Sequence, residues 1–355
     1  MINSNTEEQI RLSKYTTALI NNFKKVKVKE QPSESNKITV SPTVSLFAIA
    51  YEKFRNVIQY REESIIRRSA IERILKRRFA LNPTGKNEAE NLIRELLWAR
   101  YFPNESLGQL DIIKIQEIID KFQVLKKEVV GGRSDNKRNY YSEFIFDLMS
   151  SEIEEALTPE SSEINSLFTF YIYQVLKDKL KIENIDENTK NAYFFIALDK
   201  AFNKSDLPYL RYHLFTLYND KISSLSNEEI KEQGSKLIDL FDDIDKLIKN
   251  IIVERVLRFV KGHIPPFKIL FELFLKKKTD IDKILKNNDN LWIEIEKLCR
   301  DKYDFVKGRL NSLALKAIIY IFLTKMIIAF IVEYPLSLYY FGNINYSALI
   351  INTLF

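Results

Sequence analysis

Side chains able to carry out acid–base or nucleophilic chemistry are few in this sequence. It contains two histidines, His213 and His263, and one cysteine, Cys299. His213 stands in an aromatic segment, which is typical of a packed helix face more than of a catalytic base. The aromatic residues of that segment are Tyr209, Tyr212, Phe215 and Tyr218.

No known catalytic or nucleotide-binding motif accompanies these residues. The chain has no nucleophile elbow, no P-loop, no Gly-x-Gly-x-x-Gly and no His-Glu-x-x-His. We therefore predict no catalytic residue, no cofactor and no metal, and the sequence favours a protein that is not an enzyme. A Ser-His-Asp or Cys-His arrangement stays open, because such groups meet in space rather than at a fixed spacing.

A cluster of aspartates is the only dense group of candidate metal ligands. Carboxylate metal sites in helical bundles combine inward-facing Glu with Glu-x-x-His, and no Glu-x-x-His occurs here. The aspartates flank an apolar stripe, so we expect them on its solvated side. The cluster consists of Asp239, Asp242, Asp243 and Asp245.

A basic run offers a site for an anionic partner, either nucleic acid or an anionic lipid leaflet. At 100° per residue its members scatter around a helix, and glutamates interrupt them. A solvated helix with i,i+4 ion pairs is therefore the favoured interpretation. The candidate patch consists of Arg67, Arg68, Arg73, Lys76, Arg77 and Arg78.

The composition predicts an all-α protein. Only 8 glycines and 9 prolines occur in 355 residues, too few for the regular turns of a many-stranded β protein. Hydrophobic residues at 46% and charged residues at 29% exclude a disordered chain. The single cysteine excludes an internal disulfide and a cysteine-based zinc site. The net charge of +6 suits anionic partners without requiring them.

Apolar periodicity places helices along most of the chain. We expect four segments: an N-terminal helix and polar linker (1–41), a helical domain (42–222), a helical hairpin or bundle (223–310) and a membrane-associated segment (311–355). The expected helices cover residues 6–27, 42–80, about 88–102, 110–130, 139–157, 160–182, 189–203, 207–219, 227–262, 267–277, 279–287, 289–307 and 313–332.

The helix expected at 227–262 is the longest in the body. Its apolar residues keep a 4-3-4-3 step, which predicts the seam of an antiparallel helical hairpin or of a short coiled coil. Pro265 and Pro266 are expected to end it, because proline lacks the backbone N–H that a helix interior needs. The seam consists of Leu237, Phe241, Ile244, Ile248 and Ile251.

The segment 313–332 predicts a transmembrane helix. Its 20 residues match the length needed to cross a bilayer. Ten of residues 317–332 are Ile, Leu, Phe or Val, which contribute roughly −3 to −6 kcal/mol to insertion against about +3 for Lys325. The alternative is a buried helix of a soluble bundle. Residues 334–355, which carry no charge at all, favour the membrane.

Charges around this segment predict its orientation. Lysines and arginines precede it and none follows it, so the positive-inside rule places the N-terminal body in the cytoplasm. Lys325 would be an intramembrane charge, which marks a functional site or pairs with a carboxylate of another helix. Pro335 is expected to end the helix before a turn at Gly342. The residues before the span are Lys297, Arg300, Lys302, Lys307, Arg309 and Lys316.

The leading interpretation is a membrane-anchored, single-span helical scaffold whose cytoplasmic body binds other proteins. One alternative is a soluble, cytoplasmic, basic helical protein that binds nucleic acid and uses residues 313–355 as core or as an oligomer interface. Another is a fragment of a larger membrane protein or transport component, because residues 344–355 resemble the start of a second, incomplete apolar span.

Overall fold

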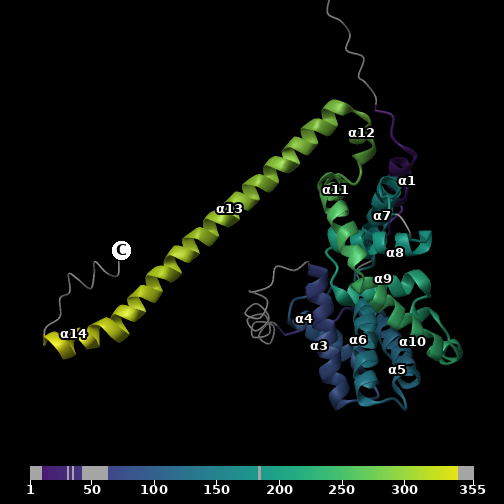
Figure 1. The fold of residues 1–355 in the computed structure, drawn as a ribbon, viewed down its shortest axis with the longest axis horizontal. Coiled ribbons are helices and arrows are strands. Elements are labelled where there is room, and N and C mark those ends of the chain that lie inside the picture. Colours follow the sequence, from purple (N-terminus) through teal and green to yellow (C-terminus); the bar gives the residue numbers. More distant parts are fainter. Residues whose placement is uncertain (1–9, 30–31, 34–35, 42–62, 183–184, 343–355) are drawn as a thin grey trace, which may run out of the picture. The chain divides into compact units, whose positions relative to one another are not determined.

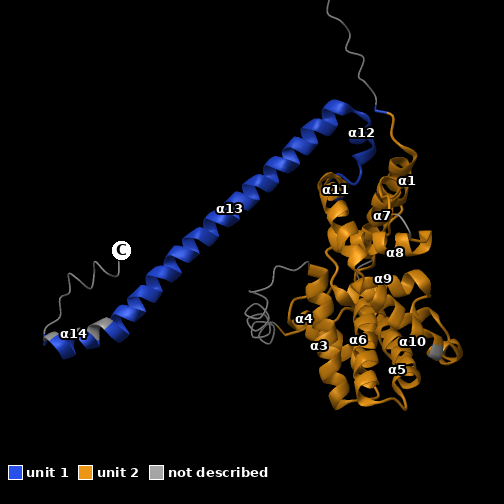
Figure 2. Ribbon diagram, viewed as in Figure 1, with its two compact units in different colours: residues 1–10, 275–355 blue, residues 11–274 orange. Residues whose placement is uncertain are grey.

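The chain folds into helices, as the computed structural model shows. The structure describes residues 10–29, 32–33, 36–41, 63–182 and 185–342. In these ranges no strand forms, and only an isolated bridge joins Lys37 to Gly108. The predicted all-α class is confirmed. The helices group into two compact units, residues 11–274 and residues 1–10 with 275–355, which are described separately below (Figures 1 and 2).

The unit of residues 11–274 contains the helical body. Short 3-10 turns at Lys177–Lys179 and Ile222–Ser224 and a π-helix, η3, at Asp199–Asn203 interrupt its α-helices. The α-helices are α1 (Lys14–Phe23), α3 (Glu63–Leu81), α4 (Glu88–Trp98), α5 (Gln109–Val130), α6 (Asp135–Leu157), α7 (Pro159–Leu176), α8 (Glu187–Leu198), α9 (Leu207–Tyr218), α10 (Asn227–Lys249) and α11 (Ile251–Lys276).

Most of these helices lie close to their expected bounds, because local signals mark where they begin and end. Gly85, at a φ of +69°, closes the turn after α3, and a Cβ there would lie 2.8 Å from the Phe79 ring. Ser226 and Glu229 form a capping box at the start of α10. Residues 42–62 of the helix expected at 42–80 lie outside the described residues.

Helix α6 is the centre of the body and packs against α3, α5 and α9 (Figure 1). Helix α10 packs against α5, α6 and α9, so it belongs to the same compact unit as they do. The structure therefore groups residues 223–274 with the helices before them, whereas the sequence suggested a division at 222. The shared apolar surface of α10 is the physical reason, since Phe241 and Ile244 are both 0% exposed.

The long helix expected at 227–262 is two helices, and this prediction was wrong. Helix α10 ends at Lys249, and α11 continues through Pro265 and Pro266 to Lys276. Ile251, expected in the seam, is 84% exposed because it begins the new helix. Packing of Phe271 and Phe274 around the Phe168 ring, with ring centroids 4.9 and 5.0 Å away, stabilises α11 beyond the prolines.

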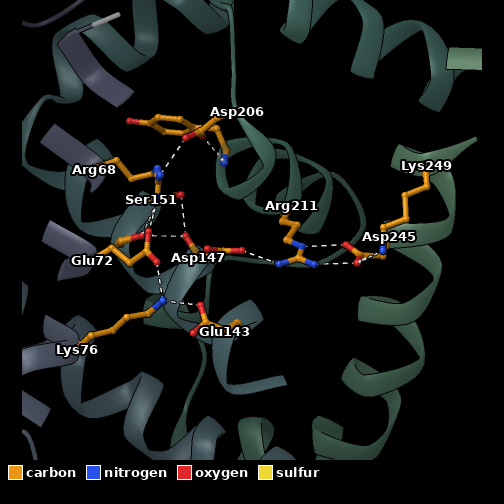
Figure 3. Close-up of polar contacts among 12 residues, drawn as sticks. Arg68, Glu72, Lys76, Glu143, Asp147, Ser151, Asp206, Arg211, Asp245 and Lys249 are labelled. Carbon is orange, nitrogen blue, oxygen red and sulfur yellow. Dashed lines mark hydrogen bonds and ion pairs between the residues drawn. The ribbon is translucent and has the colours of Figure 1, made fainter. Parts of the chain in front are cut away.

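Buried charges join the central helices (Figure 3). Arg211 of α9 donates to both carboxylate oxygens of Asp245 on α10 at 2.8 and 2.7 Å and to Asp147 of α6 at 2.6 Å. Its guanidinium also lies 4.6 Å from the centroid of the Phe144 ring. Asp245 is only 4% exposed, so the expectation that it lies on a solvated side was wrong. Arg211 supplies the partner that makes its burial possible.

The pKa values of the two acids differ because their partners differ. Burial raises the pKa of Asp147 to about 6 in spite of the bond from Arg211. Burial acts on Asp245 too, but hydrogen bonds from Arg211 and Lys249 hold its pKa below the usual value. Asp245 therefore remains the charged partner of Arg211 at neutral pH.

The unit of residues 1–10 and 275–355 is dominated by one long helix. Helix α12 (Ile281–Lys286) leads to α13 (Asn288–Ile328), whose N-cap Asn287 accepts a bond from the Asn290 N–H at 2.9 Å. A π-helix, η5 (Ala329–Glu333), and α14 (Tyr334–Phe341) follow. The expected end at Gly308 is absent, because one glycine costs only about 1 kcal/mol in a helix interior.

Pro335 also fails to end the helix, contrary to expectation. It is the second residue of α14, directly after the π-helix. At the start of a helical segment the missing N–H of proline leaves no required hydrogen bond unmade. Gly342, at a φ of +66°, ends α14 where a turn was predicted.

Arg211→Met tests the buried charge cluster. It leaves Asp245 and Asp147 buried without their main partner, and we expect the free energy of unfolding to fall by about 3–5 kcal/mol. The matched control is Arg94→Met, which breaks an exposed i,i+4 pair with Glu90 and should change stability by less than about 0.5 kcal/mol. Urea unfolding of the full chain, followed by circular dichroism, measures both. Equal losses in the two variants would contradict the prediction.

Candidate functional sites

The apolar segment of α13 is the first candidate site. Among the described residues, one helix, Asn288–Val332 including η5, is long and apolar enough to cross a membrane. Its most apolar 18-residue window has a mean hydropathy of 2.2, and only 6% of that window is buried. Side chains on different sides of the helix are exposed, such as Ile318 at 64%, Ile321 at 60% and Ile331 at 69%. By length and composition, this helix can therefore cross a membrane.

Charges divide α13 into two parts. The six basic residues predicted to precede the span are all exposed, and Arg300 pairs with Glu296 at 2.7 Å. The last acid before the apolar segment is Asp304, whereas Lys307, Arg309 and Lys316 follow it. Lys325 is half-buried within the apolar segment and makes no ion pair in the described part of the chain.

The basic run on α3 is engaged with acids of the same unit. Arg68 is 3% exposed and donates to Glu72 at 2.7 Å and Asp206 at 2.9 Å. The i,i+4 pairs expected from the sequence are present, and further pairs cross between helices. The remaining contacts join Arg67 to Glu63 and Glu154, Arg73 to Ser69, Lys76 to Glu72 and Glu143, and Arg77 and Arg78 to Glu95.

A cavity in the unit of residues 11–274 is the second candidate site. Its volume is about 580 Å³, and it lies between α7, α8 and α9 beside the end of α6. The α7 side of the wall carries no charge and consists of hydroxyl, amide and aromatic groups. These residues are Thr158, Ser161, Ser162, Asn165, Ser166, Thr169, Phe170 and Tyr173.

His213 and Asp199 form a pair on the cavity wall. His213 Nδ1 lies 2.8 Å from Asp199 Oδ2, and Asn203 donates to the other carboxylate oxygen at 2.7 Å. Asp199 is 1% exposed, whereas the His213 side chain is 29% exposed. The Nε2 atom of His213 makes no hydrogen bond to the described residues, so it is available to a molecule in the cavity.

His213 and Asp199 shift each other's pKa values. Burial lowers the pKa of His213, but the charge of Asp199 and its hydrogen bond outweigh burial and raise it above the usual value. Burial likewise opposes the charge of Asp199, and His213 holds its pKa below the usual value. Because the folded-state pKa of His213 is raised, its contribution to stability is complete below about pH 6.5 and is lost as the pH rises through the folded-state pKa.

Two further ion pairs complete the charged part of the wall. Arg67 donates to Glu154 at 3.0 Å, and Lys221 donates to Glu155 at 3.0 Å. Tyr209 donates to the second oxygen of Glu154 at 2.8 Å, while Tyr212 and Ser162 donate to Glu155. Every carboxylate oxygen of Glu154, Glu155 and Asp199 therefore accepts a hydrogen bond within the protein.

The sequence predicted that His213 lies on a packed aromatic face. The structure shows the aromatic contacts, but the side chain is also partly exposed on the cavity wall. The His213 ring stacks on Tyr209 with centroids 5.5 Å apart and lies 5.7 Å from Tyr212. The sequence did not indicate Asp199 as its partner, because the π-helix at Asp199–Asn203 departs from helical periodicity. π-Helical turns are frequent at functional sites.

One signal in the sequence could have indicated the cavity. Solvated helix faces of this chain are rich in Lys, Glu and Asp, yet residues 164–176 carry no charge. Polar residues at 165, 166 and 169 recur there at helical spacing. A neutral polar face on an otherwise apolar helix is consistent with the wall of a cavity that is open to solvent, where Ser166 and Phe170 are exposed.

The fold is that of an all-α protein with a helical body and, in the described ranges, one helix long and apolar enough to span a membrane. No family model matches the chain, and no curated protein or solved structure matches it either. The described residues also contain no cluster of His, Cys, Asp and Glu arranged to hold a metal ion. Function must therefore be argued from the two sites themselves.

Asp199→Asn tests the electrostatics of the cavity. It removes the charge that stabilises protonated His213 while burial remains, so we expect the pKa of His213 to fall from above about 6.5 to below it. Since the chain has only two histidines, a ¹³C-histidine NMR titration resolves both, and His263→Gln assigns them. A His213 pKa at or below the usual value in the unmodified protein would contradict the prediction.

Proposed function

We propose that the chain is a membrane-anchored protein: residues 313–332 cross the bilayer and the helical body lies on the cytoplasmic side. The observation that supports anchoring best is the exposure of apolar side chains on all sides of α13. Twenty helical residues span about 30 Å, the thickness of the hydrocarbon core. Lipid is the solvent in which such a surface is stable.

The charges around α13 support the orientation. Lys307, Arg309 and Lys316 lie at the N-terminal edge of the segment with no acid among residues 305–332. The positive-inside rule places this edge in the cytoplasm. At the other end, Tyr339 and Tyr340 are 82% and 70% exposed, as expected for aromatic residues at a membrane–water interface.

We propose that the body acts as a scaffold that binds other molecules at the membrane surface. Buried ion pairs join the helices of the body to one another. Exposed apolar side chains away from the cavity, including Leu110 at 77% and Ile113 at 57%, offer contact surface. Nucleic-acid binding is less well supported, because all six residues of the basic run already contact side chains of the same chain.

Fractionation of two double variants tests the anchor. Ile319→Arg with Leu323→Arg adds two central charges at about 3 kcal/mol each, which exceeds the modest net gain of insertion. We expect this variant to leave the membrane pellet in carbonate, while the unmodified chain stays. Ile293→Arg with Tyr303→Arg is the matched control, because both residues are exposed on α13 before the span. Release of the unmodified chain by carbonate would contradict the proposal.

The single cysteine tests the orientation. Cys299 is exposed and lies 14 residues before Leu313, so we expect a membrane-impermeant thiol reagent to label it in inside-out vesicles and not in intact cells. Cys299→Ser with Tyr339→Cys should show the reverse pattern. Labelling of Cys299 in intact cells would place the body on the outer side and contradict the proposed orientation.

A further inference from the structure

The charges of the cavity exclude several kinds of ligand. Each acid on the wall is paired with a base: Glu154 with Arg67, Glu155 with Lys221 and Asp199 with His213. Each cation of the wall already lies beside a carboxylate, so none is left to neutralise a phosphate group. Each carboxylate oxygen of the wall already accepts a hydrogen bond, so none is left to bind a ligand cation. The wall therefore suits an uncharged molecule.

The wall nevertheless has unused hydrogen-bonding groups. The amides of Asn165 and Asn188 line the cavity and make no side-chain hydrogen bond within the described residues. His213 presents Nε2, since Asp199 holds only Nδ1. Hydroxyl groups of Ser161 and Ser166 lie along the α7 side. Amides recognise the donor and acceptor edge of a heterocycle, and hydroxyl groups suit the hydroxyls of a sugar.

Aromatic side chains supply the apolar part of the wall. Phe170 on α7 is 62% exposed and Tyr218 on α9 is 49% exposed, so both rings have faces available for contact. Phe195 of α8 and Tyr173 of α7 also line the cavity. Flat heterocycles stack on such rings whatever their hydrogen-bonding pattern. The volume of about 580 Å³ lies within the range of small-molecule sites.

We propose that this cavity binds an uncharged nucleoside, with its base stacked on the aromatic side chains and its sugar hydroxyls held by the amide and hydroxyl groups of α7 and α8. The site lies wholly within residues 11–274 and does not depend on membrane anchoring. The asparagine amides read the edge of the base. Because every cation of the wall is already paired with a carboxylate, the site selects against phosphorylated forms of the same nucleoside.

NMR of the full chain tests the site directly. The protein is labelled with ¹³C-histidine and held in lipid nanodiscs, because the head group of a glycoside detergent is itself a ring ligand. Adenosine and uridine are the probes. We expect at least one of them to shift the His213 signal saturably in the micromolar to millimolar range and to leave His263 unchanged. The matching 5′-monophosphate should bind at least tenfold more weakly.

Two variants locate the binding. Ser166→Phe places a ring inside the cavity and should weaken nucleoside binding at least tenfold. Glu163→Phe adds the same ring to α7 at an exposed position outside the wall and should change binding less than twofold. Phe170→Ala removes a stacking surface that contributes little to the core, and we expect binding at least fivefold weaker. This variant keeps the test valid if Ser166→Phe fails to fold.

Four outcomes would overturn the proposal. The first is the absence of a saturable His213 shift with either nucleoside, and the second is equal or tighter binding of the monophosphate. The third is nucleoside binding that both Ser166→Phe and Phe170→Ala leave unchanged. The fourth is binding of maltose in place of nucleosides. Maltose is an uncharged, hydroxylated disaccharide without an aromatic base. Binding of maltose without binding of either nucleoside would show that the aromatic side chains pack against a sugar ring and not against a base.

Discussion

The bond between Arg211 and its two acids is the constraint on which the helical body depends. Arg211 lies on α9 and contacts α10 through Asp245 and α6 through Asp147. A buried charge without its partner is strongly destabilising, so the three helices must keep the one arrangement in which these atoms meet. The stacked ring of Phe144 completes the desolvated surroundings of the guanidinium.

The same constraint positions the cavity. Arg211 and His213 are two residues apart on α9, which places their side chains about 200° apart around the helix axis. One face of α9 is therefore held by Asp245 and Asp147, while the opposite face presents His213 to the cavity. Tyr209 and Tyr212 connect α9 to Glu154 and Glu155 of α6.

The helical body buries charged side chains, whereas the other unit exposes apolar ones. The body buries charges such as Arg68, Asp147 and Asp245, and each is stable there because a partner of opposite charge lies within hydrogen-bond distance. Helix α13 exposes isoleucines and leucines that water would not solvate well. The buried charges are stabilised by partners within the chain. The exposed apolar side chains of α13 require lipid or another protein around them, which is the basis of the proposed anchor.

Sequence alone determined the helical class, most helix bounds and the apolar span, because periodicity, capping residues and length are local properties. It failed at α11, where long-range packing carries the helix through Pro265 and Pro266. It also failed at Gly308, where α13 continues because one glycine costs a helix interior only about 1 kcal/mol. Only the tertiary structure decided that Asp245 is buried and that Asp199 meets His213. These pairings join residues 34 and 14 positions apart. A charge on a helix can be read from the sequence, but the folded arrangement of neighbouring helices decides whether it meets water or a partner.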